Sequence, residues 1–309
     1  MVTSKATNRA LITPSISSTW LLAAILYLLS GSAVYAQTLH IIADPQDISA
    51  WGDSLTVPFA PELQLLYNDR TIFNGGVGGQ TSIQIAARQG GVIPLLTLSG
   101  DLIPSSGGVI VTMQSIHMHN RFRRDVVLGT LSGIHGSLIF DGVSTYTFLR
   151  TTNGDSVIVY PQTPFIVDTF RRNECINIFW YGRNDYSNPT QVMNSIRSSV
   201  AFLKNGNKRF VVMSILNGSY AGRESVGGRG YKIISDINAL LKAEYPENYL
   251  DIRSYLVSQY DSSMQQDLID HENDLVPSSL RKDPLHLNTR GSKLVAAAVK
   301  KFIQAKGWE

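Results

Sequence analysis

The sequence is short of cysteine and of net charge, and each shortage excludes a class of protein. Cys175 is the single cysteine among 309 residues, so the chain forms no internal disulfide bond and depends on its core for stability. The formal net charge is only +3, which argues against nucleic acid or an anionic membrane surface as the main partner. The sequence around Cys175 is apolar, so we expect a buried, inert thiol rather than a nucleophile.

One apolar run, residues 20–29, lies near the N-terminus, behind the basic residues Lys5 and Arg9. Small residues follow the run and end at Ala36, which is the pattern of a secretory signal peptide. We therefore predict a signal peptide at residues 1–36, with cleavage after Ala36 and export to the periplasm or to the outside of a bacterial cell. The run is short for a membrane span, which takes roughly 20 apolar residues, and an uncleaved anchor is the alternative.

Short apolar strands alternate with helical patterns in two parts of the chain, which is typical of a parallel sheet covered by helices. The expected strands are residues 48–52, 71–73, 176–180, 210–216 and 249–252. The expected helices are residues 61–67, 81–88 and 233–243, one that opens at Asn188 and Pro189, and one at the C-terminus. About five strands make a sheet of the commonest size, so we predict one doubly wound α/β sheet.

Two of the expected helices carry an apolar stripe at helical spacing. One stripe comprises Val192, Ile196 and Val200, and the other comprises Leu294, Ala298 and Phe302. We predict that both stripes pack on the sheet, which makes these residues core rather than site.

The stretch between the two α/β parts, residues 89–173, has a different composition. Glycine, serine and threonine separate short β-rich runs such as residues 109–112 and 146–149, and no good helical pattern occurs. We predict an inserted β-rich module here, so the α/β domain comprises residues 37–88 and 174–309.

Four polar motifs lie at the ends of expected strands or before the last helix, where ligand sites of doubly wound sheets occur. They are GDSL at 52–55, NGGVGGQTS at 74–82, GRND at 182–185 and DPLHLN at 283–288. A hydroxyl at Ser54 would be exposed near the positive end of a helix, and the glycines of the second motif permit turns that expose N–H groups. Asn184 could donate a further hydrogen bond to an oxyanion. Pro284 favours an extended or turn geometry, from which Asp283 could reach His286.

In this order, the four motifs resemble the signature of the SGNH (GDSL-type) hydrolases, a family of esterases, lipases and carbohydrate deacetylases. The resemblance implies a three-layer, flavodoxin-like α/β/α fold. Matched motif by motif, it implies that Ser54 is the nucleophile and that Asp283 and His286 complete a Ser-His-Asp triad.

The same resemblance implies an oxyanion hole with three hydrogen-bond donors. They are the Ser54 N–H, the Gly79 N–H and the Asn184 side chain. The glycines of the second motif are doubled, so the register of the oxyanion glycine within residues 75–79 is open by one residue.

The implied function is that of a secreted serine esterase that forms an acyl-enzyme, with no cofactor and no metal. The β-rich insert of an exported enzyme is similar to that of family members that deacetylate polysaccharides. Because the insert is polar and rich in glycine, we expect no lipid-binding lid, and therefore a short acyl group such as acetyl. The expected partner is a small ester or an acetylated polysaccharide, and the oligomeric state is open. Two alternatives use the same fold: a glycan-binding module without activity, and an O-acyltransferase with the same triad.

Other features of the sequence indicate different sites more weakly. The glycine cluster has neither the Gly-Lys-Ser/Thr ending of a phosphate loop nor a spaced dinucleotide fingerprint. His117 and His119 alternate as strand residues do and could hold a metal, but no third ligand is evident. Trp51 and Tyr181 could stack on a sugar, although packing is the commoner role for aromatic residues beside a strand end. No partner pattern surrounds His40, His135 or His271.

Overall fold

The structure is a computed structural model that describes residues 42–309, apart from residues 114–117, 119–124, 205–207 and 221. The predicted signal peptide, His117 and His119 lie outside the described residues. None of the helices in the described part of the chain is both long and apolar enough to cross a membrane.

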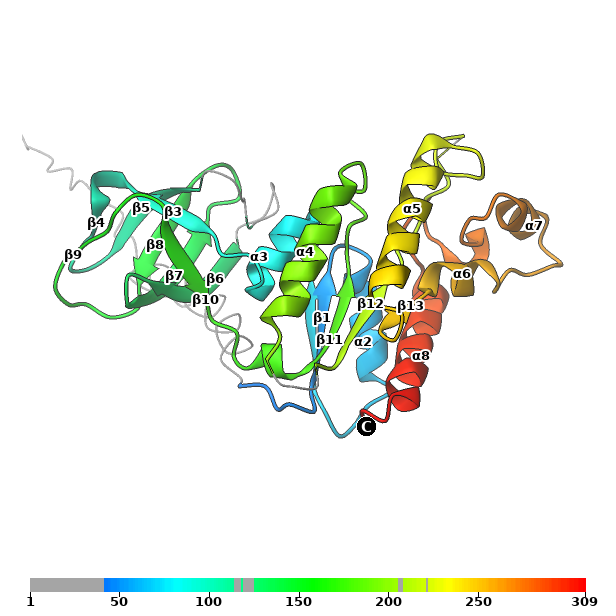
Figure 1. Cartoon of the computed structure of the whole chain (residues 1–309), viewed down its shortest axis with the longest axis horizontal. Helices are drawn as coiled ribbons and strands as arrows, with labels where there is room; N and C mark the ends of the chain where they lie inside the picture. Colours follow the sequence, from blue (N-terminus) through cyan, green and yellow to red (C-terminus); the bar gives the residue numbers. More distant parts are fainter. Residues whose placement is uncertain (1–41, 114–117, 119–124, 205–207, 221) are drawn as a thin grey trace, which may run out of the picture. The chain divides into compact units, whose positions relative to one another are not determined.

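A five-stranded parallel sheet in the order β13-β12-β11-β1-β2 forms the centre of the α/β domain (Figure 1). Its strands are β1 (Ile48–Gly52), β2 (Ile72–Gly76), β11 (Ile176–Trp180), β12 (Phe210–Met213) and β13 (Tyr249–Leu250). The last residue of β1, Gly52, pairs with Gly76 of β2 and with Trp180 of β11. The carboxyl ends of these three strands are therefore level, and the first three polar motifs meet at one edge of the sheet.

Helices cover both faces of the sheet (Figure 1). The helices are α2 (Thr56–Gln64), α3 (Ser82–Gln89), α4 (Pro189–Phe202), α5 (Arg229–Glu244), α6 (Ile252–Val257), α7 (Gln265–Glu272) and α8 (Thr289–Ala305), with short 3₁₀ turns at Ser99–Asp101, Arg172–Glu174 and Ser278–Leu280. One apolar cluster joins the sheet to α2, α6 and α8, and a second joins it to α3, α4 and α5. Because both faces are covered, all five residues of β11 are buried, as expected for a central parallel strand.

The segment between α3 and β11 forms a closed six-stranded antiparallel barrel in the order β10-β3-β5-β8-β7-β6. Its strands are β3 (Leu95–Leu98), β5 (Gly108–Met113), β6 (Asp125–Leu131), β7 (Ile134–Phe140), β8 (Tyr146–Arg150) and β10 (Thr163–Val167), and β4 (Leu102–Ile103) pairs separately with β9 (Val157–Ile158). Alternate residues of these strands fill one apolar cluster that includes Leu96, Leu138, Phe148 and Phe165. The predicted α/β fold of about five parallel strands with a β-rich insert is confirmed.

Several predicted element bounds differ from the structure: β2 continues to Gly76, β12 ends at Met213 and β13 ends at Leu250. Two further differences concern helices. The helix expected at residues 61–67 is α2, which begins at Thr56 and contains Pro61. Proline lacks an N–H, so the carbonyl of Val57 loses its helical partner, and it accepts the Asn74 side-chain amide at 3.0 Å instead. This hydrogen bond joins the first turn of α2 to the second motif, and the helix begins at Thr56, two residues after Ser54.

The buried stripe of α8 is shifted by one residue from the predicted one. Val295, Val299 and Ile303 are fully buried against the sheet, whereas Leu294, Ala298 and Phe302 flank that cluster and are only partly buried. The apolar arc of α8 is wide enough to include both stripes, and the one centred on Val299 lies deepest in the cluster that α8 shares with α2 and the sheet. In α4 the predicted stripe is correct for Val192 and Ile196, and Val200 is partly buried.

Candidate active site

Ser54 lies in the turn between the end of β1 and the start of α2. A Cβ atom on Gly52 would overlap Thr56 Oγ1 and the carbonyl oxygen of Trp180, so only glycine fits at this close approach. The Thr56 N–H donates to the carbonyl of Asp53 at 3.2 Å, which starts the helix directly after the serine. Ser54 is therefore held, half buried, at the N-terminal end of α2, where the helix dipole favours developing negative charge.

Asp53 is fully buried and holds this turn from inside the protein. Its Oδ1 accepts the Leu55 N–H at 2.9 Å. Burial raises the pKa of Asp53 to about 7, although the Leu55 N–H and the Arg183 guanidinium act in the opposite direction. Its Oδ2 finds no hydrogen-bond partner among the described residues, and Asp53 and Arg183 line the same small internal gap. The sequence motif contains Asp53, but its burial could be seen only in the fold.

The glycine-rich second motif folds into a turn that packs against Ser54. The Val77 N–H donates to the carbonyl of Gly52 at 3.1 Å, which fastens the turn to the end of β1. A Cβ atom on Gly78 would lie 3.7 Å from the Ser54 Cβ. Gly79 has a φ of +76°, a left-handed conformation that glycine adopts without strain. Gly78 and Gly79, the two candidates for the oxyanion glycine, therefore both belong to the turn beside Ser54.

Two side chains of the third motif tie it to the second. Asn184 Nδ2 donates to the carbonyl of Gln80 at 2.9 Å, which places the amide beside the glycine turn. Asp185 accepts hydrogen bonds from the Ser82 N–H at 3.0 Å and from the Ser82 hydroxyl at 2.5 Å, at the start of α3. Sequence reasoning assigned no role to Asp185. The sequence does contain a signal for this contact. Asp185 follows one buried strand, and Ser82 begins the helix that follows another.

His286 lies in the loop before α8, and Asp283 sets the shape of this loop. Asp283 Oδ1 accepts the N–H groups of Leu285 and His286 at 2.9 and 2.8 Å, and its Oδ2 lies 2.8 Å from His286 Nδ1. Partial burial alone would raise the pKa of Asp283, but these hydrogen bonds outweigh it and lower the pKa to about 2. Asp283 is therefore a carboxylate at neutral pH.

The imidazole of His286 connects this loop to the serine. His286 Nε2 lies 2.9 Å from Ser54 Oγ, although the two residues are 232 positions apart in the sequence. Together with the contact to Asp283, this makes a continuous line from carboxylate through imidazole to hydroxyl. Such a line can take a proton from the hydroxyl and return it later. Gly79 belongs to the glycine turn that meets Ser54 at Gly78, and Asn184 is hydrogen-bonded to the end of that turn at Gln80.

Trp51 and Tyr181 pack in the core, which is the commoner role for aromatic residues beside a strand end, and they do not form a stacking surface for a sugar. Trp51 is 6% exposed, and its Nε1 donates to Asn177 Oδ1 at 3.0 Å. Tyr181 is 2% exposed, and its hydroxyl donates to Ser199 Oγ at 2.7 Å. Both rings lie in the apolar cluster that joins the sheet to α3, α4 and α5, so neither is open to a sugar.

Cys175 is a buried free thiol, as predicted, and burial raises its pKa to about 11. His135, for which the sequence shows no partner pattern, has two partners in the barrel. Its Nδ1 lies 3.0 Å from Thr151 Oγ1, and its Nε2 lies 2.6 Å from Asp168 Oδ2. Within the described residues, no three His, Cys, Asp or Glu side chains gather into a metal site.

Sequence comparison finds one distant relative. No family model matches the chain. The chain is 26% identical over 271 residues to the tail spike protein of Salmonella phage epsilon15, in an alignment that covers 77% of this chain and 25% of the relative. The chain thus spans about a quarter of the length of the curated relative that it matches.

Solved structures share the architecture at low sequence identity. A candidate acylhydrolase of Bacteroides fragilis NCTC 9343 aligns with a TM-score of 0.50 and 15% identity, covering 89% of this chain and 96% of the other. A Streptococcus pneumonia protein described as a platelet activating factor aligns with a TM-score of 0.46 and 12% identity, covering 93% of this chain and 100% of the other. Together with the five-stranded sheet, the first likeness shows that the chain shares the α/β/α fold of this Bacteroides structure.

Proposed function

We propose that the chain is a serine esterase that removes short acyl groups, above all acetyl, from a carbohydrate. The observation that carries this proposal is the line from Asp283 through His286 to Ser54, with contacts of 2.8 and 2.9 Å. The description of the Bacteroides protein as a candidate acylhydrolase agrees with it. Export of the chain after cleavage at Ala36 belongs to the same proposal.

In the first half of the reaction, His286 Nε2 accepts the Ser54 hydroxyl proton while Oγ attacks the ester carbonyl. The Asp283 carboxylate keeps His286 Nδ1 protonated and stabilises the imidazolium. The imidazolium then gives its Nε2 proton to the leaving alcohol, and the acyl group stays on Ser54. In the second half, His286 takes a proton from water, and the water oxygen attacks the acyl carbon. The bond from this carbon to Ser54 Oγ then breaks, the imidazolium returns its proton to Oγ, and the acid is released.

Three donors are proposed to hold the oxyanion of the tetrahedral intermediate. The Ser54 N–H lies at the start of α2, and the Gly79 N–H belongs to the turn beside it. The Asn184 amide has two N–H bonds, of which one donates to Gln80 and the other serves the oxyanion. Gly78 is the alternative glycine, because it packs against the Ser54 Cβ.

The experiment that tests this function compares the purified protein with its Ser54→Ala variant. The substrates are p-nitrophenyl acetate, butyrate and palmitate, followed by acetylated xylan and peptidoglycan with acetate release as the readout. We expect hydrolysis that is fastest for acetate and absent in Ser54→Ala. Equal rates for the two proteins would reject the esterase proposal, and a maximum at palmitate would reject the preference for short acyl groups.

A further inference from the structure

An open cavity of about 570 Å³, with a lining that is part polar and part apolar, borders the acid of the proposed triad. Asp283 and Pro284 belong to its lining, so the residue that contacts His286 Nδ1 also borders the cavity. The remaining walls come from α7, from the loop after β12 and from the 3₁₀ turn Ser278–Leu280 with the residues that follow it. A volume of this size is typical of small-ligand sites.

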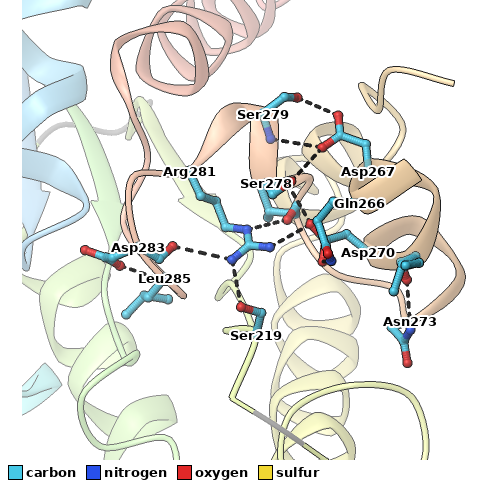
Figure 2. A network of polar contacts seen from close by, with 12 residues as sticks. Ser219, Gln266, Asp267, Asp270, Asn273, Ser278, Ser279, Arg281, Asp283 and Leu285 are labelled. Atoms are coloured by element: carbon cyan, nitrogen blue, oxygen red, sulfur yellow. Dashed lines mark hydrogen bonds and ion pairs between the residues drawn. The ribbon is translucent and has the colours of Figure 1, made fainter. Parts of the chain in front are cut away.

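Arg281 holds the wall of the cavity nearest Asp283 in one conformation (Figure 2). Its side chain is 7% exposed, and its Nη2 lies 2.7 Å from Oδ2 of the buried Asp270 on α7. Its Nη1 donates to Ser219 Oγ at 2.8 Å, and its Nε donates to the carbonyl of Val276 at 2.6 Å. One guanidinium thus joins three separate segments of the lining, and the planar group is well suited to this because its donors are fixed.

Asp267 fixes the adjoining wall in a similar way. Its Oδ1 accepts the Ser278 hydroxyl at 3.0 Å and the Ser279 N–H at 2.9 Å, and its Oδ2 accepts the Ser279 hydroxyl at 2.5 Å (Figure 2). Asp267 is fully buried on α7, so these hydrogen bonds clamp the 3₁₀ turn to that helix. The cavity is therefore formed before any ligand enters it, which lowers the entropic cost of binding.

The charges of the lining favour a neutral ligand. Its ionisable side chains with full charges are Asp270, Arg281, Lys282 and Asp283, two of each sign. Arg281 is already paired with Asp270, and Asp283 is engaged by His286. One exposed lysine is a weak basis for binding a phosphate or a carboxylate.

The uncharged part of the lining combines apolar surface with hydrogen-bonding groups. Tyr220 is 39% exposed and Ile269 is 40% exposed, so an aromatic ring and an aliphatic side chain are open to a ligand. Gln266, Asn273 and Ser225 line the same cavity with amide and hydroxyl groups. A sugar ring has the matching chemistry, with C–H groups on its faces and hydroxyl groups around its rim.

The geometry points to this cavity as the binding site for a neutral sugar unit of the substrate, next to the unit whose ester is cleaved. This inference rests on the proposed function, because it assigns the cavity to the carbohydrate part of the same ester substrate. If the cavity binds a sugar unit, the substrate is an ester of an oligosaccharide or polysaccharide rather than a free small ester.

The test uses two variants of exposed lining residues, Tyr220→Ala and Gln266→Ala. Gln265→Ala is the matched control for the second, because Gln265 is the exposed neighbour on α7 and lies outside the cavity lining. Tyr160→Ala is the matched control for the first, because Tyr160 is 80% exposed and also lies outside the lining. The values of kcat and KM are measured on p-nitrophenyl acetate and on O-acetylated xylo-, manno- and chito-oligosaccharides.

We expect the parent to prefer at least one oligosaccharide over p-nitrophenyl acetate in kcat/KM. On that substrate Tyr220→Ala and Gln266→Ala lose about tenfold or more in kcat/KM, mainly through KM, and their loss on p-nitrophenyl acetate is at least fivefold smaller. Both control variants retain parent values on both substrates. Unchanged KM in the two cavity variants overturns the inference, as does a parent that hydrolyses the aryl ester but no oligosaccharide. A parent no faster than Ser54→Ala on every substrate overturns the proposed function itself.

Discussion

Within the part of the chain that the structure describes, carboxylate, imidazole and hydroxyl form a line at two places, one at the edge of the parallel sheet and one on the barrel. In the sheet domain, Asp283, His286 and Ser54 are joined by contacts of 2.8 and 2.9 Å. In the barrel, Asp168, His135 and Thr151 are joined by contacts of 2.6 and 3.0 Å. Distances alone therefore do not separate a catalytic arrangement from an ordinary polar cluster.

The two lines differ in what surrounds the hydroxyl. The Thr151 N–H donates to the carbonyl of His135 at 3.0 Å, so this amide is already used and cannot stabilise an oxyanion. Thr151 follows strand β8, and the chain continues to β9 without a helix between them. Ser54, by contrast, lies at the start of α2 beside a glycine turn. The candidate site is therefore marked by the hydrogen-bond donors around the nucleophile, and not by the proton-transfer line alone.

The largest expected effect separates the two hydroxyls. Ser54→Ala should lower kcat on p-nitrophenyl acetate by roughly 10⁴-fold or more, because no other group can carry the acyl intermediate. Thr151→Val and His135→Ala should keep parent kcat, since neither residue takes part in the reaction. Steady-state kinetics of the three purified variants check this, and a large loss in either barrel variant would remove the distinction between the two lines.

The next effect compares the cores of the two regions. Phe148 in the barrel and Phe59 in α2 are both fully buried, so truncation of either to alanine should cost about 3–5 kcal/mol of unfolding free energy. Only Phe59→Ala should also lower kcat, because Phe59 anchors α2, the helix that follows Ser54, to the sheet, with its ring centroid 5.4 Å from that of Trp180 on β11. Denaturant unfolding and kinetics below the unfolding transition measure the two quantities. Equal loss of kcat in both variants would contradict the expectation that only the core under α2 supports the active site.

A smaller effect is expected at the proposed oxyanion donors. Asn184→Ala should lower kcat by about 100- to 1000-fold without unfolding the protein, which is the usual cost of one lost donor. Asn188→Ala is the control, because Asn188 lies in the same loop and only caps α4 through the Gln191 N–H. The control should lose about 1 kcal/mol of stability and keep its kcat. If both asparagine variants show the same kcat as the parent, Asn184 is not an oxyanion donor.

A further effect concerns the pH dependence of stability in the sheet domain. Folding raises the pKa of Asp53 to about 7, above the roughly 3.9 of an unfolded chain, chiefly by burial. Between these two values the folded state binds more protons than the unfolded state, so the contribution of Asp53 falls as the pH rises and levels off above the upper value. Asp53→Asn should remove this contribution. We therefore expect the free energy of unfolding, measured with urea, to fall less from about pH 4 to about pH 8 in the variant than in the parent.

Local sequence patterns predicted most of the sheet domain. The strands at 48–52 and 176–180 match β1 and β11 in full, because a buried parallel strand is a short apolar run with clear ends. The start of α2 was missed because Pro61 is typical of a first helical turn, and the compensating hydrogen bond from Asn74 comes from another strand. The closure of the barrel was also beyond prediction, since β10 pairs with both β3 and β6, and such long-range pairing leaves no local signal.

In the candidate site, too, residues in local motifs were predicted and contacts between distant segments were not. The four motifs predicted Ser54, Asp283 and His286, and the structure places these residues in contact. Ser54 follows the end of β1, and the loop before α8 brings His286 to it. The buried pairs behind the site were not predicted. Asp185 with Ser82 and Arg281 with Asp270 join residues from separate motifs or segments, and each partner alone looks like ordinary loop chemistry.

The central claim is that His286 activates Ser54, and covalent labelling tests it most directly. The parent, His286→Ala and His135→Ala are treated with a fluorophosphonate probe, and the labelled residue is located by peptide mass spectrometry. The account predicts one adduct on Ser54 in the parent and in His135→Ala, and little or none in His286→Ala. An unlabelled parent, an adduct on another residue, or full labelling of His286→Ala would contradict it.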